Sequence, residues 1–192
     1  DGILSSSLNV EVEGEITIGF NVHELFVTKP LTNNTNLKVI NSNINSDSNI
    51  KIYSNITLFT NNGTLTLENI SISGYNAVVN NSNGDLVIKD VNISSTNQAI
   101  NNSGKMSIDE SNITGTNYAI YNNSTETNTI SNSTLTSSSN AIYKNNSSET
   151  TIINTTIKGS VTNSKSTGIL NITGGETGNT ITGSMSNTGK AN

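Results

Sequence analysis

The chain has 192 residues, of which Asn, Ser and Thr supply 91, whereas 31% are hydrophobic and 4% are aromatic. The net charge is −5 and every one of the nine cationic side chains is a lysine, a balance that argues against a phosphate-binding surface for nucleic acid. There is no cysteine, which excludes disulfides and thiolate metal sites, and no apolar run reaches the roughly 18 residues that suggest a membrane span.

The first 36 residues differ from the rest of the chain. Apolar residues alternate at Ile16, Ile18 and Phe20, which favours a strand, but they do not keep the spacing that governs the later sequence. The only histidine, His23, falls in this part. We therefore expect a single domain, residues 1–192, in which residues 1–36 form irregular first rungs and residues 37–192 form regular ones.

From residue 37 onward, an aliphatic residue is followed five residues later by a second one, and the pair recurs every 20 to 22 residues. The first members are Leu67, Ile88, Ile108, Ile130 and Ile152, and the second are Ile72, Ile93, Ile113, Leu135 and Ile157. The same spacing occurs at Val39 and Ile44, one step of 28 residues upstream. Self-similarity with such a period is typical of a solenoid.

The segments around each pair alternate apolar and polar residues and are rich in β-branched types, so they predict short strands separated by tight turns. A third strand follows in each repeat, with Val78, Ile100, Ile120 and Ile142 as its core residues. The expected fold is all-β: a right-handed parallel β-helix of about eight rungs of 20–28 residues, stacked about 4.8 Å apart. After Ile157 the third strand is expected early, at Val161 and again at Ile181.

A polar column follows the first aliphatic column at a distance of two residues. It consists of Asn69, Asp90, Glu110, Asn132 and Asn154. Asn and Asp tolerate turn conformations, and stacked amides can bond from rung to rung. We therefore expect a turn at this column, closed by an amide ladder.

Three phrases, "NYAIYNN" (117–123), "SNAIYKNN" (139–146) and "FTNN" (59–62), resemble the right-handed β-helix repeats of the pectate-lyase-like superfamily. They are most similar to those of bacterial and archaeal surface adhesins with GGAIYN-like repeats. The resemblance covers residues 37–160 and implies an extracellular location at the cell surface or cell wall.

Two tyrosines form the first candidate site. Tyr121 and Tyr143 each follow a core isoleucine by one residue and should share an outward column, with Asn101 on the preceding rung. Stacked rings beside amides would suit a sugar, whose apolar face packs on a ring. The alternative is an aromatic pair that only stabilises the sheet.

Charged residues form the second candidate. Asp90 and Glu110 are neighbours in the turn column and could bind Ca²⁺ or raise the pKa of one carboxyl, although both also serve as turn residues. One position earlier, Glu68, Lys89 and Asp109 should alternate in charge along an exposed ion-pair ladder of little energetic value.

Pectate lyases of this superfamily use acidic Ca²⁺ ligands with an arginine base, and its polygalacturonases use three aspartates with a histidine. This chain has no arginine and one histidine. The sequence therefore favours a non-enzymatic adhesin or stalk segment that binds a glycan or a host surface protein, without catalytic residues or a cofactor other than Ca²⁺ at Asp90 and Glu110. The alternative is a polysaccharide lyase or hydrolase-like β-helix enzyme.

Overall fold

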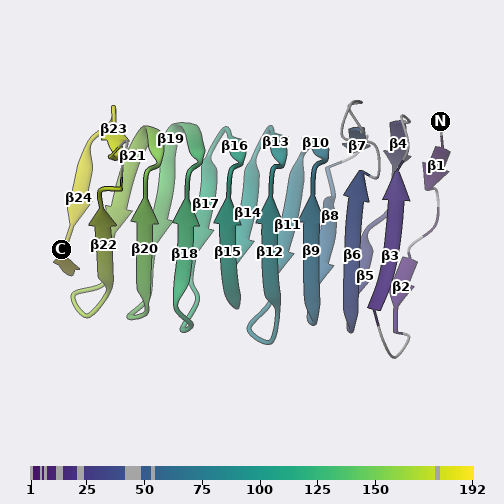
Figure 1. Cartoon of the computed structure of the whole chain (residues 1–192), viewed down its shortest axis with the longest axis horizontal. Coiled ribbons are helices and arrows are strands. Elements are labelled where there is room, and N and C mark those ends of the chain that lie inside the picture. Colours follow the sequence, from purple (N-terminus) through teal and green to yellow (C-terminus); the bar gives the residue numbers. More distant parts are fainter. Residues whose placement is uncertain are drawn as a thin grey trace.

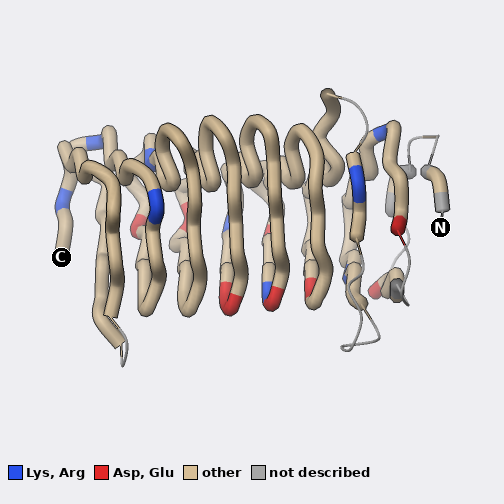
Figure 2. The backbone as a smooth tube through the Cα atoms, turned by 90° about the horizontal axis from the view of Figure 1, so that it is seen from above, with Lys and Arg blue, Asp and Glu red and all other residues tan. Residues whose placement is uncertain are grey.

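The computed structural model of this protein describes residues 2–4, 6, 8–11, 15–20, 24–41, 49–52, 55–175 and 178–192. Within these ranges the chain forms 25 strands and no helix. The strands pair in parallel and stack as a β-solenoid of about eight turns. The expected all-β parallel solenoid is thus confirmed, and its coils follow one another from one terminus to the other (Figures 1 and 2).

Each turn of the solenoid supplies strands to three faces, which we number in the order in which the chain visits them from Glu15 onward. Face 1 holds β3 (Glu15–Phe20), β6 (Asn36–Asn41), β9 (Thr64–Glu68), β12 (Asp85–Lys89), β15 (Lys105–Asp109), β18 (Asn128–Ser131), β20 (Glu149–Ile153), β22 (Ile169–Thr173) and β25 (Lys190–Ala191). Face 2 holds β1 (Gly2–Leu4), β4 (Glu24–Val27), β7 (Asn49–Ile52), β10 (Ser71–Gly74), β13 (Asn92–Ser95), β16 (Asn112–Gly115) and β23 (Thr180–Ile181).

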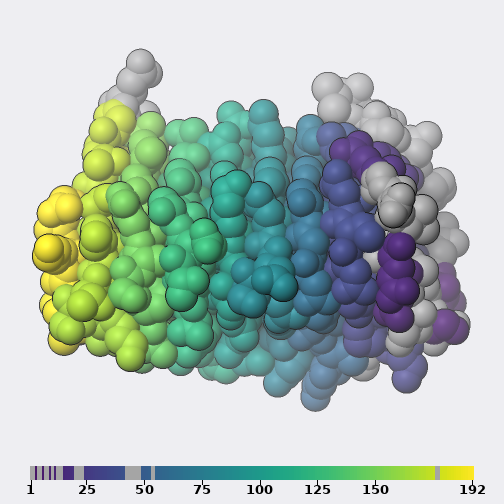
Figure 3. Space-filling model, turned by 90° about the horizontal axis from the view of Figure 1, so that it is seen from below, coloured from purple at the N-terminus to yellow at the C-terminus, as the bar shows by residue number. Residues whose placement is uncertain are grey.

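Face 3 holds β2 (Leu8–Val10), β5 (Leu31–Asn33), β8 (Thr57–Asn61), β11 (Asn76–Asn80), β14 (Gln98–Asn102), β17 (Tyr118–Asn122) and β24 (Met185–Asn187). Two long strands, β19 (Thr134–Lys144) and β21 (Thr156–Asn163), turn the corner, so that their first halves lie in face 2 and their second halves in face 3. The space-filling view shows these rungs in chain order along an elongated body (Figure 3).

The three predicted aliphatic columns are in register. Leu67, Ile88, Ile108, Ile130, Ile152 and Ile172 pair along face 1. Ile72, Ile93, Ile113, Leu135 and Ile157 pair along face 2, and Val78, Ile100, Ile120, Ile142 and Val161 along face 3. All are buried except the half-buried Ile172, and each fully buried side chain contributes about 1.5–3 kcal/mol.

The ends of the chain differ in detail from the expectation. In β3, Ile16 and Ile18 pair with Leu37 and Val39 of β6, so this strand joins the face 1 register directly. Ile181 pairs with Ile157 of face 2, which corrects its predicted place in the third strand. His23 and Ile44 lie outside the described residues.

A fourth inward column lies in face 1, two residues before the first. It contains Leu37, Leu65, Leu86, Met106, Asn128, Thr150 and Leu170. Asn128 and Thr150 are as buried as their apolar neighbours. The core therefore contains a polar region in the rungs that hold β18 and β20.

The predicted turn between faces 1 and 2 is confirmed by its backbone. All five column residues have positive φ angles, between 47° and 52°: Asn69, Asp90, Glu110, Asn132 and Asn154. Few non-glycine residues adopt this left-handed conformation, and Asn and Asp are enriched among them. The residue after each turn-column residue is buried, and in Ser111 it forms a hydrogen bond between rungs. The Ser111 hydroxyl accepts from the Val91 N–H of the preceding rung at 3.1 Å and donates to the Asp109 carbonyl of its own rung at 2.6 Å.

The continuous amide ladder lies elsewhere, at the end of face 3. Four buried asparagines, Asn33, Asn61, Asn80 and Asn102, each donate from Nδ2 to Oδ1 of the asparagine on the next rung at 2.7–3.1 Å, and Asn122 is the last acceptor. In the turn column, side-chain amides of neighbouring rungs bond only between Asn154 and Asn132, at 3.3 Å, among the described residues. The prediction of an amide ladder at the turn column is therefore wrong in its position, because the ladder lies two residues past the face 3 core position.

Lys144 interrupts the face 3 ladder. It pairs with Asn122 before it and Asn163 after it, and its side chain is fully buried. The ammonium donates to the carbonyl and to Oδ1 of Asn146, both at 2.8 Å, and burial lowers the pKa of Lys144 to about 8. Asn122 donates instead to Thr150, while Oδ1 of Asn163 is buried without a hydrogen-bond partner.

Candidate binding site on face 3

A cluster of three tyrosines lies on the outer surface of face 3. In β17 two consecutive residues, Ala119 and Ile120, are buried, so the flanking residues Tyr118 and Tyr121 both emerge on the outer surface. Tyr143 of β19 is the register partner of Tyr121. Face 3 thus presents two outward columns, one containing Tyr118 and the other containing Tyr121 and Tyr143.

The rings contact one another closely. Tyr121 and Tyr143 are stacked, with centroids 5.5 Å apart and planes 9° from parallel. Tyr118 meets both in T-shaped geometry, at 5.4 Å from Tyr121 and 5.8 Å from Tyr143. Offset-stacked and T-shaped pairs are the favoured arrangements of aromatic rings, so the cluster holds its rings in a fixed orientation while each remains half-exposed.

Two amides beside the tyrosines have no hydrogen-bond partner. Gln98 and Asn101 of β14 are the register partners of Tyr118 and Tyr121, and no protein group bonds to either side chain in the described part of the chain. By contrast, Asn76 on the preceding rung accepts from Asn97 at 3.1 Å. Most amides around this face are used in bonds between rungs, so these two are available to a ligand.

The site is uncharged. The outward columns contain Thr57, Thr60, Asn76, Val79, Gln98, Asn101, Tyr118, Tyr121, Asn140, Tyr143, Ser160 and Thr162. The set contains no Asp, Glu, His, Lys or Arg. Lys144, the nearest cation in β19, points into the core. The arrangement can offer ring faces and neutral donors and acceptors, which are the groups that hold polar, uncharged molecules.

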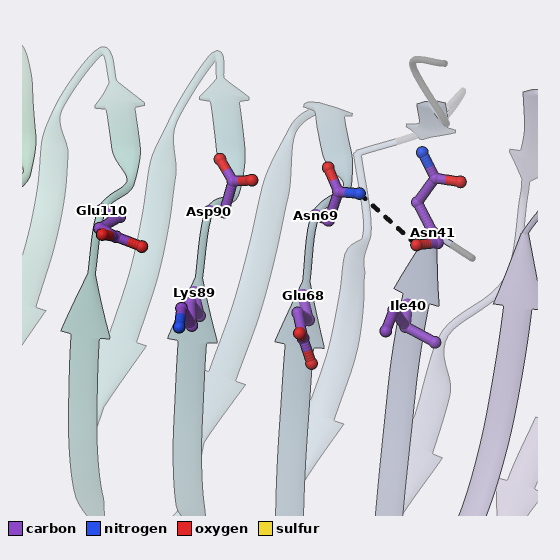
Figure 4. A pocket seen from close by; sticks show the side chains of 7 residues that line it. All are labelled: Ile40, Asn41, Glu68, Asn69, Lys89, Asp90 and Glu110. Atoms are coloured by element: carbon purple, nitrogen blue, oxygen red, sulfur yellow. Dashed lines mark hydrogen bonds between the residues drawn. The ribbon is translucent and has the colours of Figure 1, made fainter. Parts of the chain in front are cut away.

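Asp90 and Glu110 lie at the turn between faces 1 and 2, along a groove with a cavity of about 160 Å³ that is also lined by Ile40, Asn41, Glu68, Asn69 and Lys89 (Figure 4). Both carboxylates are exposed, and in Figure 4 they follow Asn41 and Asn69 along one row. Among the described residues no group of three or more His, Cys, Asp or Glu side chains could hold a metal ion. Ca²⁺ binding here stays a prediction.

The expected ion-pair ladder does not form as predicted. Glu68 and Lys89 are register partners, but Glu68 pairs with Lys38 at 2.8 Å, which raises the pKa of Lys38 through the hydrogen bond and the carboxylate charge. Asp109 accepts from Ser131 at 2.7 Å and Asn132 at 2.9 Å on the next rung. Lys38 lies two residues before the Glu68 column, and its long side chain reaches across the step.

The structure places the predicted site residues Asn101, Tyr121 and Tyr143 in one outward column on successive rungs. It adds Tyr118 and Gln98, which the sequence did not identify. The signal for Tyr118 was present in the phrase "YAIY", where a pair of small and aliphatic residues separates the tyrosines by three positions.

The class of protein defined by these features is a parallel β-solenoid with an uncharged tyrosine–amide surface. No family model, curated protein or solved structure matches the chain. The described residues include no helix that is long and apolar enough to cross a membrane.

Proposed function

We propose that this protein is a non-enzymatic segment of a microbial cell-surface adhesin or stalk, which binds glycans through the tyrosine cluster of face 3. The resemblance of its "AIY" phrases to pectate-lyase-like surface adhesins supports an extracellular location at the cell surface or wall. The observation that carries the binding role is the coincidence of three half-exposed rings with two unbonded amides, Gln98 and Asn101.

A purely structural tyrosine pair would account for less of this arrangement. Cross-strand aromatic pairs stabilise sheets by roughly 0.2–1 kcal/mol, and that role requires neither a third ring nor free amides beside it. Ligand pockets characteristically combine aromatic surface with a few polar groups that fix orientation. Many copies on a cell would convert weak binding at each site into strong attachment.

The experiment is a glycan array probed with the purified protein, beside variants Tyr121→Ala and Tyr143→Ala. Binding that is lost in both variants supports the proposal. Each variant is checked for an unchanged thermal unfolding temperature and β-rich circular dichroism. The absence of glycan binding by the wild-type protein, or binding that neither substitution affects, would contradict it.

The enzymatic alternative is tested in the same preparation. Release of reducing ends or unsaturated products from polyuronate, mannan or host glycans, abolished by Asp90→Ala or Glu110→Ala, would overturn the adhesin proposal. We expect no product with or without Ca²⁺, because acid–base cleavage of a glycan requires a base poised beside a charge-stabilising group.

A further inference from the structure

We infer that the face 3 site takes an uncharged hexopyranose unit, seated against the Tyr121 ring and held by the amides of Asn101 and Gln98. The inference rests on the proposed glycan-binding function and specifies the ligand and its position. It places the sugar at one end of the tyrosine stack.

The stack itself leaves the sugar little room between its rings. Because Tyr121 and Tyr143 are stacked at 5.5 Å, each ring covers one face of the other. Because Tyr143 lies on the following rung, the second face of Tyr121 should be turned toward the preceding rung, where Asn101 is its register partner. An asparagine side chain is shorter than a tyrosine, so the Tyr121 ring extends further from the sheet than the Asn101 amide. The apolar face of a pyranose can pack against the exposed face of this ring, above the amide.

The side-chain amides of Asn101 and Gln98 supply the polar contacts to the sugar. A carboxamide has an acceptor oxygen and two N–H donors side by side, so one amide can accept from and donate to two neighbouring hydroxyls of a sugar ring. Asn101 and Gln98 lie three residues apart in β14, on the same outer surface. Neither must break a protein hydrogen bond to receive a ligand, because neither side chain makes one among the described residues.

The neighbouring amides show why this position differs from other rungs. Asn76, in the column of Gln98, donates to Thr57 at 3.3 Å and accepts from the Gln98 backbone N–H at 3.1 Å. Asn140, in the same column, accepts from Thr162 at 2.8 Å. The amides of this column are therefore engaged in β11, before the two rungs that hold the site, and in β19, after them. Among the face 3 residues described, unbonded amides lie beside a tyrosine ring only at Gln98 and Asn101.

The charge of the site selects neutral sugars. Among the described residues of the two outward columns, no cation is present to pair with a carboxylate or sulfate, and the whole chain carries a net charge of −5. Transfer of an anionic group onto this surface would cost its hydration without a compensating ion pair, and the field of the protein would repel it. Uronates, sialylated glycans and sulfated glycans are therefore expected to bind more weakly than neutral ones.

The test is isothermal titration with two sets of oligosaccharides of matched length: neutral oligomers of glucose, mannose, galactose and N-acetylglucosamine, and acidic oligomers of galacturonate and mannuronate. At low ionic strength we expect at least one neutral oligomer to bind ten-fold more tightly than any acidic one. Tyrosine fluorescence gives a second readout, because the chain has five tyrosines and no tryptophan.

Variants locate the sugar. Asn101→Leu keeps the size of the side chain and removes its amide, and should weaken binding of the neutral oligomer at least ten-fold. Tyr121→Phe keeps the ring and should retain most of the affinity, whereas Tyr121→Ala should lose it. The matched control is Asn123→Leu, a change at an exposed asparagine just beyond the end of β17, which should leave binding unchanged.

The possible outcomes test the hexopyranose inference and the proposed glycan-binding function separately. Preference for acidic oligomers, or neutral binding that Asn101→Leu and Gln98→Leu leave unchanged, overturns this inference while glycan binding stands. Capture of a host surface protein through Tyr121, without any glycan affinity, also overturns it and replaces the glycan by a protein ligand. Failure of every oligosaccharide and of the array removes the proposed function as well.

Discussion

Replacing Lys144 by asparagine should stabilise the protein. The substitution removes a buried ammonium and restores the residue that the other rungs use in the face 3 ladder. In the folded state burial lowers the pKa of Lys144 from 10.5 to about 8. Since one pKa unit corresponds to about 1.4 kcal/mol, holding the lysine protonated in the core costs on the order of 3 kcal/mol at neutral pH.

A ladder bond from the asparagine introduced by Lys144→Asn would add a smaller contribution to the free energy of unfolding. An amide at position 144 can donate to the buried Oδ1 of Asn163, which has no partner now, and a hydrogen bond of this kind contributes about 0.5–1.5 kcal/mol. Against this, the Asn146 groups that accept from the ammonium lose their donor, which costs about 1–3 kcal/mol. We expect Lys144→Asn to be more stable by about 0.5–3.5 kcal/mol in urea unfolding at pH 7.

The pH dependence gives the decisive measurement. Because the folded pKa of Lys144 lies below its unfolded value, the unfolded state binds more protons between pH 8 and 10.5, so this residue makes the wild type more stable as the pH rises through that window. The difference in unfolding free energy between Lys144→Asn and the wild type, which we call the stability gap, should decrease by about 2 kcal/mol from pH 7 to 9.5. Lys144→Met, which lacks both charge and amide, should show the same narrowing with a smaller gap. A variant less stable than the wild type at pH 7, with a gap that does not change with pH, would refute the reasoning.

Three further predictions concern stability. Asn80→Asp puts a carboxylate opposite the Asn102 oxygen that Asn80 now donates to at 2.7 Å, and it should lower the free energy of unfolding in urea by about 3 kcal/mol or more. The outward Asn101→Asp should be nearly neutral, and equal losses in the two variants would contradict the ladder. Ile120→Asp, at a fully buried core position, should lose several kcal/mol in a thermal melt, and a tolerated change would contradict the register. Glu110→Asn should stabilise by about 0.5–1 kcal/mol by denaturant titration, because the residue has a φ of 50° and asparagine suits that conformation better; a loss would mean that the Glu110 side chain has a stabilising contact.

The regular part of the fold could be predicted from the sequence because its aliphatic residues recur with little variation. Ile88, Ile108 and Ile130 fall at equivalent positions of successive rungs and pair as expected. The fourth inward column was missed because Asn128 and Thr150 stand in it, and buried polar residues cannot be told from exposed ones in a chain with 36 asparagines. Their burial depends on bonds to other rungs, such as Asn102 to Asn128 at 3.1 Å.

The position of the asparagine ladder could not be predicted from the sequence for the same reason. Asparagines follow both the first and the third core columns, at Asn69 and Asn80 for example, and either column could form a ladder. The structure decides between them: Asn69 has a φ of 52° in a partly exposed turn, whereas Asn80 is fully buried. Only at Asn80 must the amide find all its partners within the protein.

The candidate site was predicted in part. Tyr121 and Tyr143 follow equivalent isoleucines, so their shared column could be read from the repeat. Tyr118 could not be placed by alternation alone, because strict alternation would put it on the inner side with Ile120. The strand departs from alternation at Ala119 and Ile120, both of which are buried, and this turns Tyr118 outward beside Tyr121. The free state of Gln98 and Asn101 depends on contacts that no sequence pattern encodes.

The interruption at Lys144 has a consequence for the motions of the native protein. In a solenoid each rung contacts only its neighbours, so stability is a sum of local terms and the chain can open at its weakest interface. The asparagine chain that joins Asn33 to Asn122 does not continue through Lys144 to Asn163. Amide hydrogens of β21 and β22 should therefore exchange with solvent together, and at a lower free energy of opening than those of β11 and β14, so that the solenoid behaves in hydrogen exchange as two cooperative units.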